Sequence, residues 1–278
     1  MKTNITVHTI VKNEEKWVWY ALMSVKDYVD KILVYDTDST DRTVEIIKSI
    51  KDKKIDFEKK GEVDADQLVK LRQEQIEKTT TEWFLIVDGD EIWPKKTIEE
   101  FKKLIQKNNE NLWGVVIRAW NFVGDVYHYH PESDYYHWPF APKSYKGWAN
   151  LRGIKKNIPG LHIKGSYPLE AYCDSTGKPI QNYGEKRLGF LTNRYLHTSY
   201  LIRSSSREVD KTTLNRTFKN KMEIGKRFPK RFEYPEVFYK KAPEIVSSPW
   251  KRRSTFVLLV SMILTPIKYL KRSITRSF

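Results

Sequence analysis

The chain has 278 residues, of which 40% are apolar and 31% are charged. This composition is typical of a globular protein with a sizeable core, and it excludes disordered and collagen-like chains. The single cysteine, Cys173, excludes a disulfide scaffold and a cysteine zinc site and fits a reducing cytosol. The N-terminus becomes charged before any apolar stretch of signal-peptide length, so we expect no secretion and interpret the N-x-T sequons at Asn4 and Asn215 as chance.

The net charge of +15 is unevenly distributed along the chain. Residues 1–110 contain 20 Lys and Arg against 23 Asp and Glu, whereas residues 111–278 contain 30 against 12. This polarity predicts that the second part meets an anionic surface or substrate. Nucleic acid, phospholipid and sugar phosphate all fit at this point.

The first 120 residues alternate between the two periods of secondary structure. Apolar and β-branched runs predict strands at residues 5–11, 32–35, 55–57, 83–87 and 113–119. Helical spacing of apolar residues predicts helices at residues 17–28, 43–50, 66–77 and 97–106. Strands that alternate with helices indicate βαβ units, so the predicted fold class is α/β, with a mostly parallel, Rossmann-like sheet and flanking helices.

After residue 120 the pattern changes. Residues 121–150 are crowded with Tyr, His, Trp and Pro and predict long loops or a hairpin laid over the sheet. We expect a strand at 189–201 and a helix at 210–225. The expected division is a globular domain at 1–228, a Pro-rich linker at 229–249 and a basic amphipathic helical segment at 250–278.

Two acidic clusters follow apolar strands: DTDSTD at residues 36–41 and DGDE at residues 88–91. In open parallel sheets, ligands bind outside the carboxyl ends of the strands. Two carboxylate clusters there suit a hydrated Mg²⁺ or Mn²⁺ ion and a nucleotide. The alternative is that both clusters are ordinary turns and helix N-caps. Their joint presence, in this order, favours the site.

Three segments, TIVKNEE, ILVYDTDSTDRTVEII and WFLIVDGDEIWP, resemble the core of family 2 glycosyltransferases with the GT-A fold. That family typically shows an N-terminal strand ending in an Asn-Glu-like pair, a VDxxSTDxT segment, and a DxD motif after an apolar strand. The resemblance covers residues 4–120 and is looser beyond. It implies a GT-A sheet and an enzyme that moves a sugar from a nucleotide-diphosphate sugar to a hydroxyl of a glycan or lipid-linked acceptor, similar to envelope or lipopolysaccharide-type sugar transferases.

The resemblance also implies a set of residues for nucleotide-sugar binding. Asn13 and Glu14 stand where the first strand of the family meets the nucleotide. Asp36 and Asp38 stand in the segment that binds base and ribose. Thr37 replaces the usual second aspartate of that segment, which leaves the preferred base open.

Further residues match the family around the DxD motif. Arg72 matches an arginine near the nucleotide, although a solvated helix face also explains it. Asp88 would contact the ribose, and Asp90 would hold a Mn²⁺ or Mg²⁺ ion that bridges the diphosphate and stabilises the leaving group. His197, after an apolar stretch, stands where many GT-A enzymes bring a late histidine to the metal; a structural histidine is the alternative.

The family inverts configuration, so an Asp or Glu on the opposite side of the sugar must accept the acceptor's proton. We predict Asp134, with Glu132 next, because both lie in HPESDYYHW, where aromatic neighbours could stack on a sugar and raise a carboxyl pKa. A surface-loop role is the simpler interpretation of either acid. Glu170 and Asp174 are the next candidates.

Several other side chains are better explained by roles other than metal binding. The three histidines within residues 128–137 lack the i, i+4 spacing of helical zinc ligands, so acceptor contact or aromatic packing explains them better. Arg152 and His162 resemble an arginine and a histidine of lipopolysaccharide-type transferases. Ile163 stands where those enzymes often carry glutamate, which puts that acid's role in doubt.

The C-terminal segment contains 14 uncharged residues, 254–267, flanked by basic ones. At about 1.5 Å per residue this run is about 21 Å long, short of the roughly 30 Å hydrocarbon core. We therefore expect an interfacial helix whose seven basic residues bind anionic headgroups, with the enzyme peripheral on the cytoplasmic face of the cell membrane. The alternative is a helix packed on the catalytic domain or on a second subunit.

Two other functions compete with sugar transfer. A nucleotidyltransferase that makes a sugar nucleotide would need a Gly-rich, basic loop near its N-terminus, and TIVKNEE contains no glycine. A non-enzymatic protein that binds membrane or nucleic acid would explain the basic half, but no recognition motif is present, so we expect no nucleic-acid partner.

Overall fold

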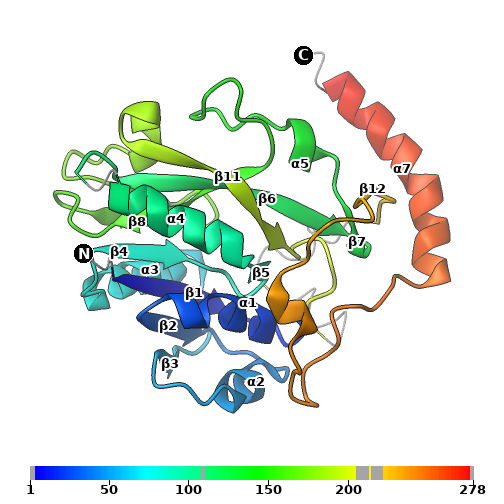
Figure 1. Cartoon of the computed structure of the whole chain (residues 1–278), viewed down its shortest axis with the longest axis horizontal. Coiled ribbons are helices and arrows are strands. Elements are labelled where there is room, and N and C mark those ends of the chain that lie inside the picture. Colours follow the sequence, from blue (N-terminus) through cyan, green and yellow to red (C-terminus); the bar gives the residue numbers. More distant parts are fainter. Residues whose placement is uncertain (1–3, 108–109, 205–212, 214–221, 276–278) are drawn as a thin grey trace.

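The computed structural model describes residues 4–107, 110–204, 213 and 222–275. Figure 1 shows the helices grouped around one large sheet, with the C-terminal helix α7 at the edge of the molecule and apart from the other helices. The predicted α/β class with its flanking helices and C-terminal helix is confirmed.

The large sheet has the strand order β12-β7-β6-β8-β4-β1-β2-β3, with β11 beside β6 and β5. Strands β4, β1, β2 and β3 pair in parallel, and β11 runs parallel to β6. Strand β8 joins β4 and β6 in antiparallel orientation. The strands of this sheet are β1 (Ile5–Val11), β2 (Lys31–Asp36), β3 (Ile55–Lys59), β4 (Trp83–Ile86), β5 (Glu91–Ile92), β6 (Gly114–Val123), β7 (Asp125–Tyr129), β8 (Ala149–Lys155), β11 (Leu188–His197) and β12 (Lys226–Arg227).

A separate two-stranded sheet contains β9 (His162–Lys164) and β10 (Ala171–Cys173). The described helices are α1 (Val18–Val25), α2 (Thr43–Ser49), α3 (Ala65–Lys78), α4 (Lys95–Lys107), α5 (Glu132–Tyr135) and α7 (Thr255–Thr275), with short 3-10 helices η1 (Lys26–Tyr28), η2 (Ile180–Lys186) and η3 (Glu236–Tyr239). Each strand and helix predicted before residue 120 is present within a few residues of its expected bounds.

Local sequence explains why these elements form. The β-branched run of β1 is buried almost throughout, as expected of a strand covered on both faces. Helix α3 begins with a capping box, in which the Asp64 side chain accepts from the backbone of Gln67 and the Gln67 side chain accepts from the backbone of Asp64. Helix α4 buries one stripe, Ile98, Phe101 and Ile105, at a spacing of three or four residues.

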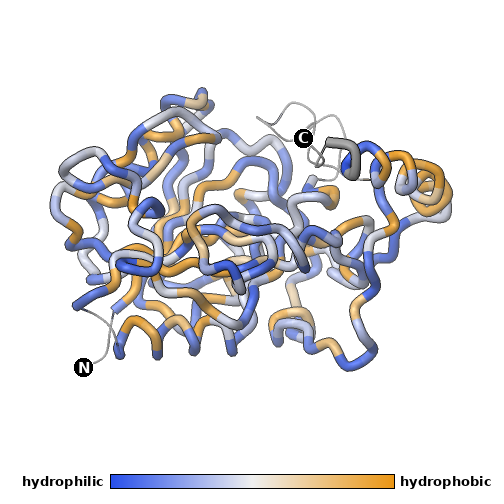
Figure 2. Tube along the Cα trace, turned by 90° about the horizontal axis from the view of Figure 1, so that it is seen from above, coloured by the Kyte–Doolittle hydropathy of each residue, from blue (hydrophilic) through white to orange (hydrophobic). Residues whose placement is uncertain are grey.

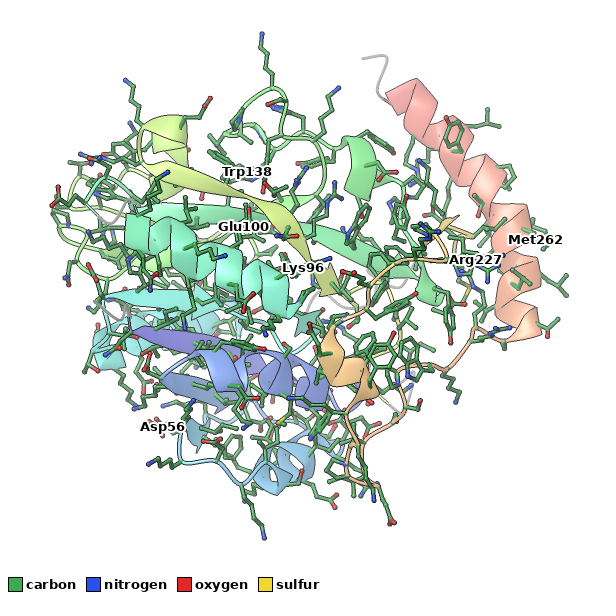
Figure 3. The ribbon with its side chains drawn as sticks, in the orientation of Figure 1. Asp56, Lys96, Glu100, Trp138, Arg227 and Met262 are labelled. Carbon is green, nitrogen blue, oxygen red and sulfur yellow. The ribbon has the colours of Figure 1, made fainter. Side chains whose placement is uncertain are left out.

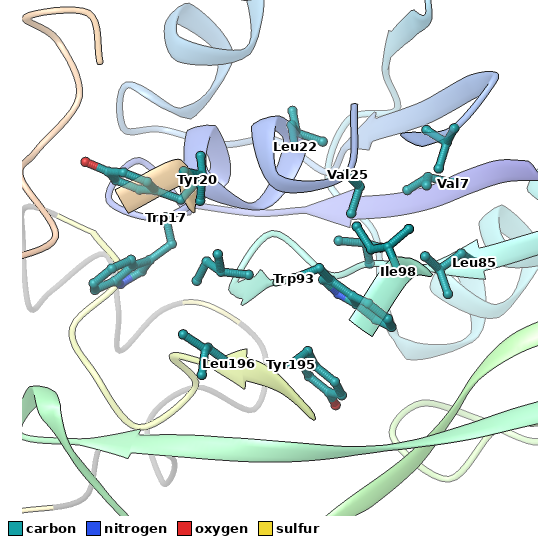
Figure 4. Packing of buried hydrophobic residues seen from close by; sticks show 14 of the residues in the cluster. Val7, Trp17, Tyr20, Leu22, Val25, Leu85, Trp93, Ile98, Tyr195 and Leu196 are labelled. Carbon is teal, nitrogen blue, oxygen red and sulfur yellow. The ribbon is translucent and has the colours of Figure 1, made fainter. Parts of the chain in front are cut away.

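The main core lies between the sheet and helices α1 and α4. Trp93 stacks on Tyr195 with ring centroids 5.1 Å apart, and Figure 4 shows Val25 and Ile98 beside this pair. Trp17 and Tyr20 extend the core toward the C-terminal part of the chain. The interlocked aromatic packing fixes β5 against β11, which matters for the site described below.

The region after residue 120 also forms much as expected. Strand β6 continues to Val123, turns at Gly124 with φ +75° and returns as β7, so the segment predicted as long loops or a hairpin over the sheet contains a hairpin that extends the sheet at its edge. The strand expected at 189–201 is β11. The helix expected at 210–225 lies largely outside the described residues, and its last four positions, 222–225, are not helical.

The Pro-rich segment 229–249 packs against the domain. Val237, Phe238 and Val246 are buried in the main core, and Phe238 meets Tyr20 edge to face at 5.4 Å. The division into a domain at 1–228, a linker at 229–249 and a segment at 250–278 stays a prediction. None of the helices in the described part of the chain combines the length and apolar character that crossing a bilayer requires.

Candidate active site

A cleft of about 660 Å³ opens where the carboxyl ends of β1 and β4 meet the end of β11. This is the place where open α/β sheets bind ligands. Its polar and charged lining residues are Lys12, Glu14, Thr37, Glu62, Arg72, Asp88, Asp90, Asn121, Asn150, Arg152, Tyr167, Glu170, His197, Ser199, Tyr200, Arg203 and Thr213. Of the acidic residues predicted at the site, Glu14, Asp88, Asp90 and Glu170 line the cleft.

The turn after β4 carries the two aspartates of the DGD motif. Gly89 is required there because a Cβ at this position would lie 2.8 Å from Val11 Cγ1 and 3.0 Å from Glu14 Cγ, at the end of β1. The backbone N–H of Thr198 donates to the Asp90 carbonyl at 2.9 Å. The turn is therefore held between β1 and the end of β11.

Strand pairing explains how His197 reaches Asp90. His197 lies opposite Glu91 in the β5–β11 ladder and opposite Asn121 in the β6–β11 ladder. Its Nδ1 lies 3.1 Å from Asn121 Oδ1, and its Nε2 lies 3.3 Å from Asp90 Oδ2. Because an amide oxygen only accepts, Nδ1 carries the proton and Nε2 faces the carboxylate.

Asp90 is also bound by an arginine that the sequence analysis did not single out. Arg203 Nη1 donates to Asp90 Oδ2 and lies 3.0 Å from Glu14 Oε1. All three side chains are buried. Arg203 follows Asp90 by 113 residues in the chain, so no local pattern links the two.

Asp88 lies between two further arginines. Arg152 Nη2 donates to Asp88 Oδ2 at 3.1 Å, and Arg72 Nη2 lies 3.7 Å from Asp88 Oδ1. Burial alone would raise the pKa of Asp88, but the charges of Arg152 and Arg72 outweigh it and hold that pKa below its usual range. Asp88 is therefore ionised at neutral pH.

Arg152 is shared with a second, fully buried carboxyl. It donates to Glu91 Oε1, directly after the DGD motif. Burial raises the pKa of Glu91 to about 7, although Arg152 opposes the shift. Arg152 lies in β8, which pairs with β4, and this pairing brings it to the DGD turn. The resemblance had pointed to Arg152 but not to Glu91.

Arg72 reaches the cleft from α3. One turn further along this helix, Gln75 Nε2 donates to the carbonyls of Thr9 (3.1 Å) and Leu33 (3.2 Å), which docks α3 on β1 and β2. Arg72 Nε lies 3.2 Å from Glu170 Oε1 in the β9–β10 connection. Burial lowers the pKa of Arg72, but Tyr172, Asp88 and Glu170 reverse the shift and raise it. Arg72 is thus not on a solvated helix face.

The first acidic cluster forms a tight loop beside the cleft. Asn13, in the left-handed region with φ +57°, accepts on Oδ1 from the backbone N–H of Thr40 at 2.8 Å and of Asp41 at 3.3 Å. Asp36 is buried, and its Oδ1 has no hydrogen-bond partner in the described part of the chain. Asp38 is exposed with φ +69°. None of Asn13, Asp36 and Asp38 is among the cleft-lining residues.

The predicted catalytic acids lie elsewhere. Asp134 in α5 accepts from Lys226 Nζ at 2.8 Å, and Glu132 lies 3.7 Å from His130 Nδ1. Neither lines the cleft. Asp174 caps its own turn by accepting from the Thr176 side chain at 2.6 Å. Glu170 does line the cleft, and its Oε2 is buried without a hydrogen-bond partner among the described residues.

The remaining histidines have structural partners. His128 Nδ1 lies 2.6 Å from Asp125 Oδ1, and His130 Nε2 lies 2.7 Å from Arg272 Nη1. His137 forms an isolated β-bridge with Lys146. His162 contacts the carbonyl of Gly160 and does not line the cleft.

Asp90 and His197 carry donor atoms that would suit a divalent ion, and Arg203 binds the same Asp90 oxygen in the described structure. Carboxylate oxygen is a preferred ligand of Mg²⁺ and Mn²⁺, and the imidazole of His197 would supply a nitrogen ligand. Within the described residues, no group of three or more His, Cys, Asp or Glu side chains could hold a metal ion. Diphosphate and water oxygens would complete the coordination, as is usual for Mg²⁺ sites with few protein ligands.

Comparison with known proteins agrees with this geometry. The model of the glycosyl transferase family 2 matches residues 6–161, more than half of the chain. The chain belongs to this family. The predicted resemblance is confirmed, and the match includes both acidic clusters together with Arg72 and Arg152.

Among curated proteins, the family 2 chain is 37% identical over 101 residues to the SPbeta prophage-derived glycosyltransferase SunS of Bacillus subtilis and equally to glycosyltransferase SunS of Bacillus phage SPbeta. The match covers 36% of this chain and only 23% of the length of either relative.

Among solved structures, S. aureus TarS 1-349 in complex with UDP-GlcNAc is similar with a TM-score of 0.48 at 16% identity, over 70% of this chain and 58% of that one. Mannosyltransferase PcManGT from Pyrobaculum calidifontis, in complex with GDP-Man and Mn²⁺, has a TM-score of 0.37 at 17% identity, over 56% of this chain and 45% of that one. Structural similarity at this level says nothing about the activity of this chain.

Proposed function

We propose that the protein is a glycosyltransferase that moves a sugar from a nucleotide-diphosphate sugar to a hydroxyl group of a glycan or lipid-linked acceptor. The observation that carries the proposal is the DGD turn in the cleft, with Asp90 beside His197 and Asp88 between two arginines. Membership of family 2 supports the reaction class. The site, rather than the fold, supports the assignment of individual residues.

The donor nucleotide has binding groups on both sides of the DGD turn. Asp88 would accept from the ribose hydroxyls, and Asp36, whose Oδ1 lacks a hydrogen-bond partner among the described residues, would accept from the base or ribose after a small rearrangement of its loop. Glu14, just after the end of β1, would bind the nucleotide together with Asp36 and Asp88. Asn13 and Asp38 would shape this loop rather than contact the donor, because Asn13 binds its backbone and Asp38 is exposed.

The diphosphate would meet three arginines, each of which is paired with carboxylates in the described structure. Arg72, Arg152 and Arg203 all line the cleft, and guanidinium groups bind phosphate oxygens with paired hydrogen bonds. Asp90 and His197 would hold a Mn²⁺ or Mg²⁺ ion, which when bound supplies positive charge beside the diphosphate leaving group. These residues are in place before the sugar bond breaks, so little reorganisation is needed.

Inversion of configuration requires a base on the acceptor side of the sugar. We propose Glu170 for this role, since it lines the cleft and its Oε2 is not engaged by another described group. Arg72 holds its Oε1 and so orients the carboxylate. Asp134 and Glu132 remain the sequence-based candidates, but they contact Lys226 and His130 instead of the cleft.

We further propose that the enzyme works at the inner face of the cell membrane and does not bind nucleic acid. The excess of basic residues after residue 110 supports an anionic surface as a partner. The apolar, uncharged run in the C-terminal segment favours a lipid surface over nucleic acid, which is bound mainly through phosphate contacts.

The test is release of nucleoside diphosphate from a panel of nucleotide sugars with Mn²⁺ present. We expect wild-type protein to hydrolyse or transfer at least one donor, and Asp90→Asn to lose on the order of 10³-fold in turnover, since it weakens charge stabilisation at the leaving group. Asp56→Asn is the matched control, because Asp56 forms only an exposed ion pair with Lys31 at 2.8 Å and lies outside the cleft (Figure 3).

The outcomes separate the alternatives. A folded wild-type protein that releases no nucleoside diphosphate from any donor contradicts the proposal. Formation of a sugar nucleotide and diphosphate from a nucleoside triphosphate and a sugar phosphate would identify a nucleotidyltransferase instead. Full activity in Asp90→Asn would remove Asp90 from the metal site.

A further inference from the structure

Helix α7 is attached to the domain by a face that mixes polar and apolar side chains. Ser261 is fully buried, Val257 is half-buried, and the Thr265 side chain accepts from the backbone N–H of Ile224 at 3.0 Å. Lys268 Nζ lies 3.8 Å from Glu223 Oε1, and Arg272 donates to Glu223 and contacts His130 Nε2 at 2.7 Å. The inward positions 257, 261, 265, 268 and 272 are three or four residues apart, as one face of a helix requires.

The opposite face of α7 is apolar and exposed. Its side chains are 49–68% exposed and include Phe256, Leu259, Met262, Ile263, Ile267 and Leu270, which we call the apolar ridge. Figure 2 shows hydrophobic residues along α7 at the periphery, and Figure 3 shows Met262 on the outer side of the helix. A helix on a soluble surface normally has the reverse arrangement, with its apolar face inward.

The attachment is rigid at the start of the helix. Arg253 Nε donates to Asp125 Oδ2 at 3.1 Å, and its other nitrogens donate to the carbonyls of Val123, Glu223 and Ile224 at 3.0–3.3 Å. Both members of the ion pair are buried. A guanidinium with four such partners fixes the helix direction, so the ridge is presented outward in a set orientation.

Internal pairing reduces the charge that the segment can offer a surface. Arg253, Arg272 and Lys268 bind Asp125 or Glu223, so at least three of the seven basic residues counted in the sequence are engaged with the domain. Lys251 and Arg252 at the start of the helix are exposed. Burial of the ridge, more than charge, must therefore supply the free energy of binding.

A second cavity lies at the same end of α7. It has about 300 Å³ and is lined by Trp17, Leu201, Ile202, Pro249 and Val257, with Lys251 and Arg252 also in its wall. Apolar walls with basic side chains suit an acyl chain that ends in an anionic headgroup. Tyr200 lines both this cavity and the active-site cleft, so a lipid held here would lie next to the cleft.

We propose that the apolar ridge of α7 is a docking surface for an anionic lipid bilayer, with the helix lying in the interface. At about 1.5 Å per residue its 21 residues extend for about 30 Å along the membrane plane. A second copy is disfavoured as the occupant, because it would bring together two halves with 30 basic against 12 acidic residues each. This inference rests on the proposed function, because the bilayer is the surface at which the proposed sugar transfer would take place.

The test measures binding of the full chain to vesicles of phosphatidylcholine with phosphatidylglycerol, by flotation at low and high salt. Ile263→Lys with Ile267→Lys adds two positive charges while removing two ridge side chains. We expect binding to fall more than about tenfold, because loss of apolar burial outweighs the added charge. Both side chains are exposed, so the fold should persist, as checked by circular dichroism.

Two controls match this variant. Leu169→Lys changes an 87% exposed apolar side chain in the β9–β10 connection and should leave vesicle binding unchanged. Lys251→Ser with Arg252→Ser should weaken binding a few-fold at low salt and hardly at all at high salt, because salt screens exposed charges. Equal or tighter binding by the double lysine variant would overturn the proposal in favour of binding by charge alone.

Other outcomes address the alternative occupant and the enzyme activity. A wild-type protein that stays off the vesicles overturns the proposal, and a dimer that the double lysine variant dissociates would assign the ridge to a second copy. Nucleoside diphosphate release is measured in the same samples without lipid. Vesicle binding without donor turnover would refute the proposed function alone, and turnover without vesicle binding would refute the docking surface alone.

Discussion

Arginines meet carboxylates both in the active-site cleft and at the base of α7, and the two places differ in what the pairs enclose. In the cleft, Arg203 is shared by Asp90 and Glu14, and Arg152 by Asp88 and Glu91. All of these groups except the fully buried Glu91 line an open volume of about 660 Å³. At the base of α7, Arg253 is bound to one carboxylate, Asp125, and to three backbone carbonyls, so all of its partners belong to a single buried contact.

The difference indicates which pairs exchange partners. A guanidinium shared between two carboxylates beside a cleft can release one carboxylate when an incoming anionic ligand takes its place. A guanidinium that is saturated by buried groups cannot do so without a large desolvation cost. The cleft pairs therefore suit binding, whereas the α7 pairs suit attachment. The following substitutions test this contrast, from the largest expected effect to the smallest.

The largest effect should come from the proposed base. Glu170→Gln keeps the size and shape of the side chain beside Arg72 but cannot accept the acceptor's proton, so transfer should fall about 10²- to 10⁴-fold while donor binding changes little. Steady-state transfer and donor binding by calorimetry provide the two readouts. Asp134→Asn and Glu132→Gln serve as comparisons, and a larger loss in either would return the base to α5.

Breaking the buried pair at α7 should cost stability instead of turnover. Asp125→Asn leaves the Arg253 charge buried without its counter-ion, which should lower the free energy of unfolding by about 3 kcal/mol in urea. The matched exposed pair is Lys96 with Glu233 at 3.1 Å, and Glu233→Gln should cost less than about 1 kcal/mol (Figure 3). Similar losses in the two variants would mean that the α7 pair is no more structural than a surface pair.

The sequence predicted the elements that depend on local pattern and the residues that a motif names. Strand β1, the DGD turn after β4 and the stripe of α4 follow from periodicity and turn chemistry. The resemblance predicted His197 as a metal ligand; the pairing of β5 with β11 brings it to Asp90, and its role as a ligand stays a prediction.

The rest depends on contacts between distant parts of the chain. Arg203 and Glu170 lie 113 and 80 residues after Asp90, and no spacing rule relates them to it. Periodicity predicted an amphipathic C-terminal helix but not which face meets the domain, because that choice is made by Glu223 and Ile224. The aromatic neighbours of Asp134 suggested it as the catalytic base, but in the structure Asp134 in α5 accepts a hydrogen bond from Lys226.

A histidine buried in β1 gives the folded chain a pH-dependent stability. His8 in β1 stacks on Phe84 at 4.3 Å, and its Nε2 lies 2.6 Å from Thr79 Oγ1. Burial first, and then the charges of Arg72 and Lys156, lower the pKa of His8 to about 3. Between pH 6.5 and 3, His8 therefore binds a proton in the unfolded chain but not in the folded one. The free energy of unfolding keeps its full value with respect to His8 above pH 6.5 and falls as the pH decreases below it.

This sign gives a stability test. From pH 6 to pH 4 the wild type should lose about 2 kcal/mol through His8, within the limit of about 1.4 kcal/mol per pH unit for one proton. His8→Gln, which does not titrate and can still bond Thr79, should remove that part of the slope in urea unfolding. An unchanged slope would show that groups other than His8 dominate acid unfolding.

The smallest effect tests the contrast itself, at Arg203. In the described structure its guanidinium lies on Asp90 and Glu14, where a divalent ion would compete with it. Arg203→Ala should therefore tighten Mn²⁺ binding in the absence of donor by about tenfold, since two carboxylates lose their internal cation. His197→Ala should weaken it by about tenfold with little loss of thermal stability, because it removes a proposed ligand. Electron paramagnetic resonance of free Mn²⁺ measures both without catalysis. If Arg203→Ala loosens the metal or unfolds the protein, the Asp90 pair is an attachment like that of Arg253, and the distinction between exchangeable and fixed pairs fails.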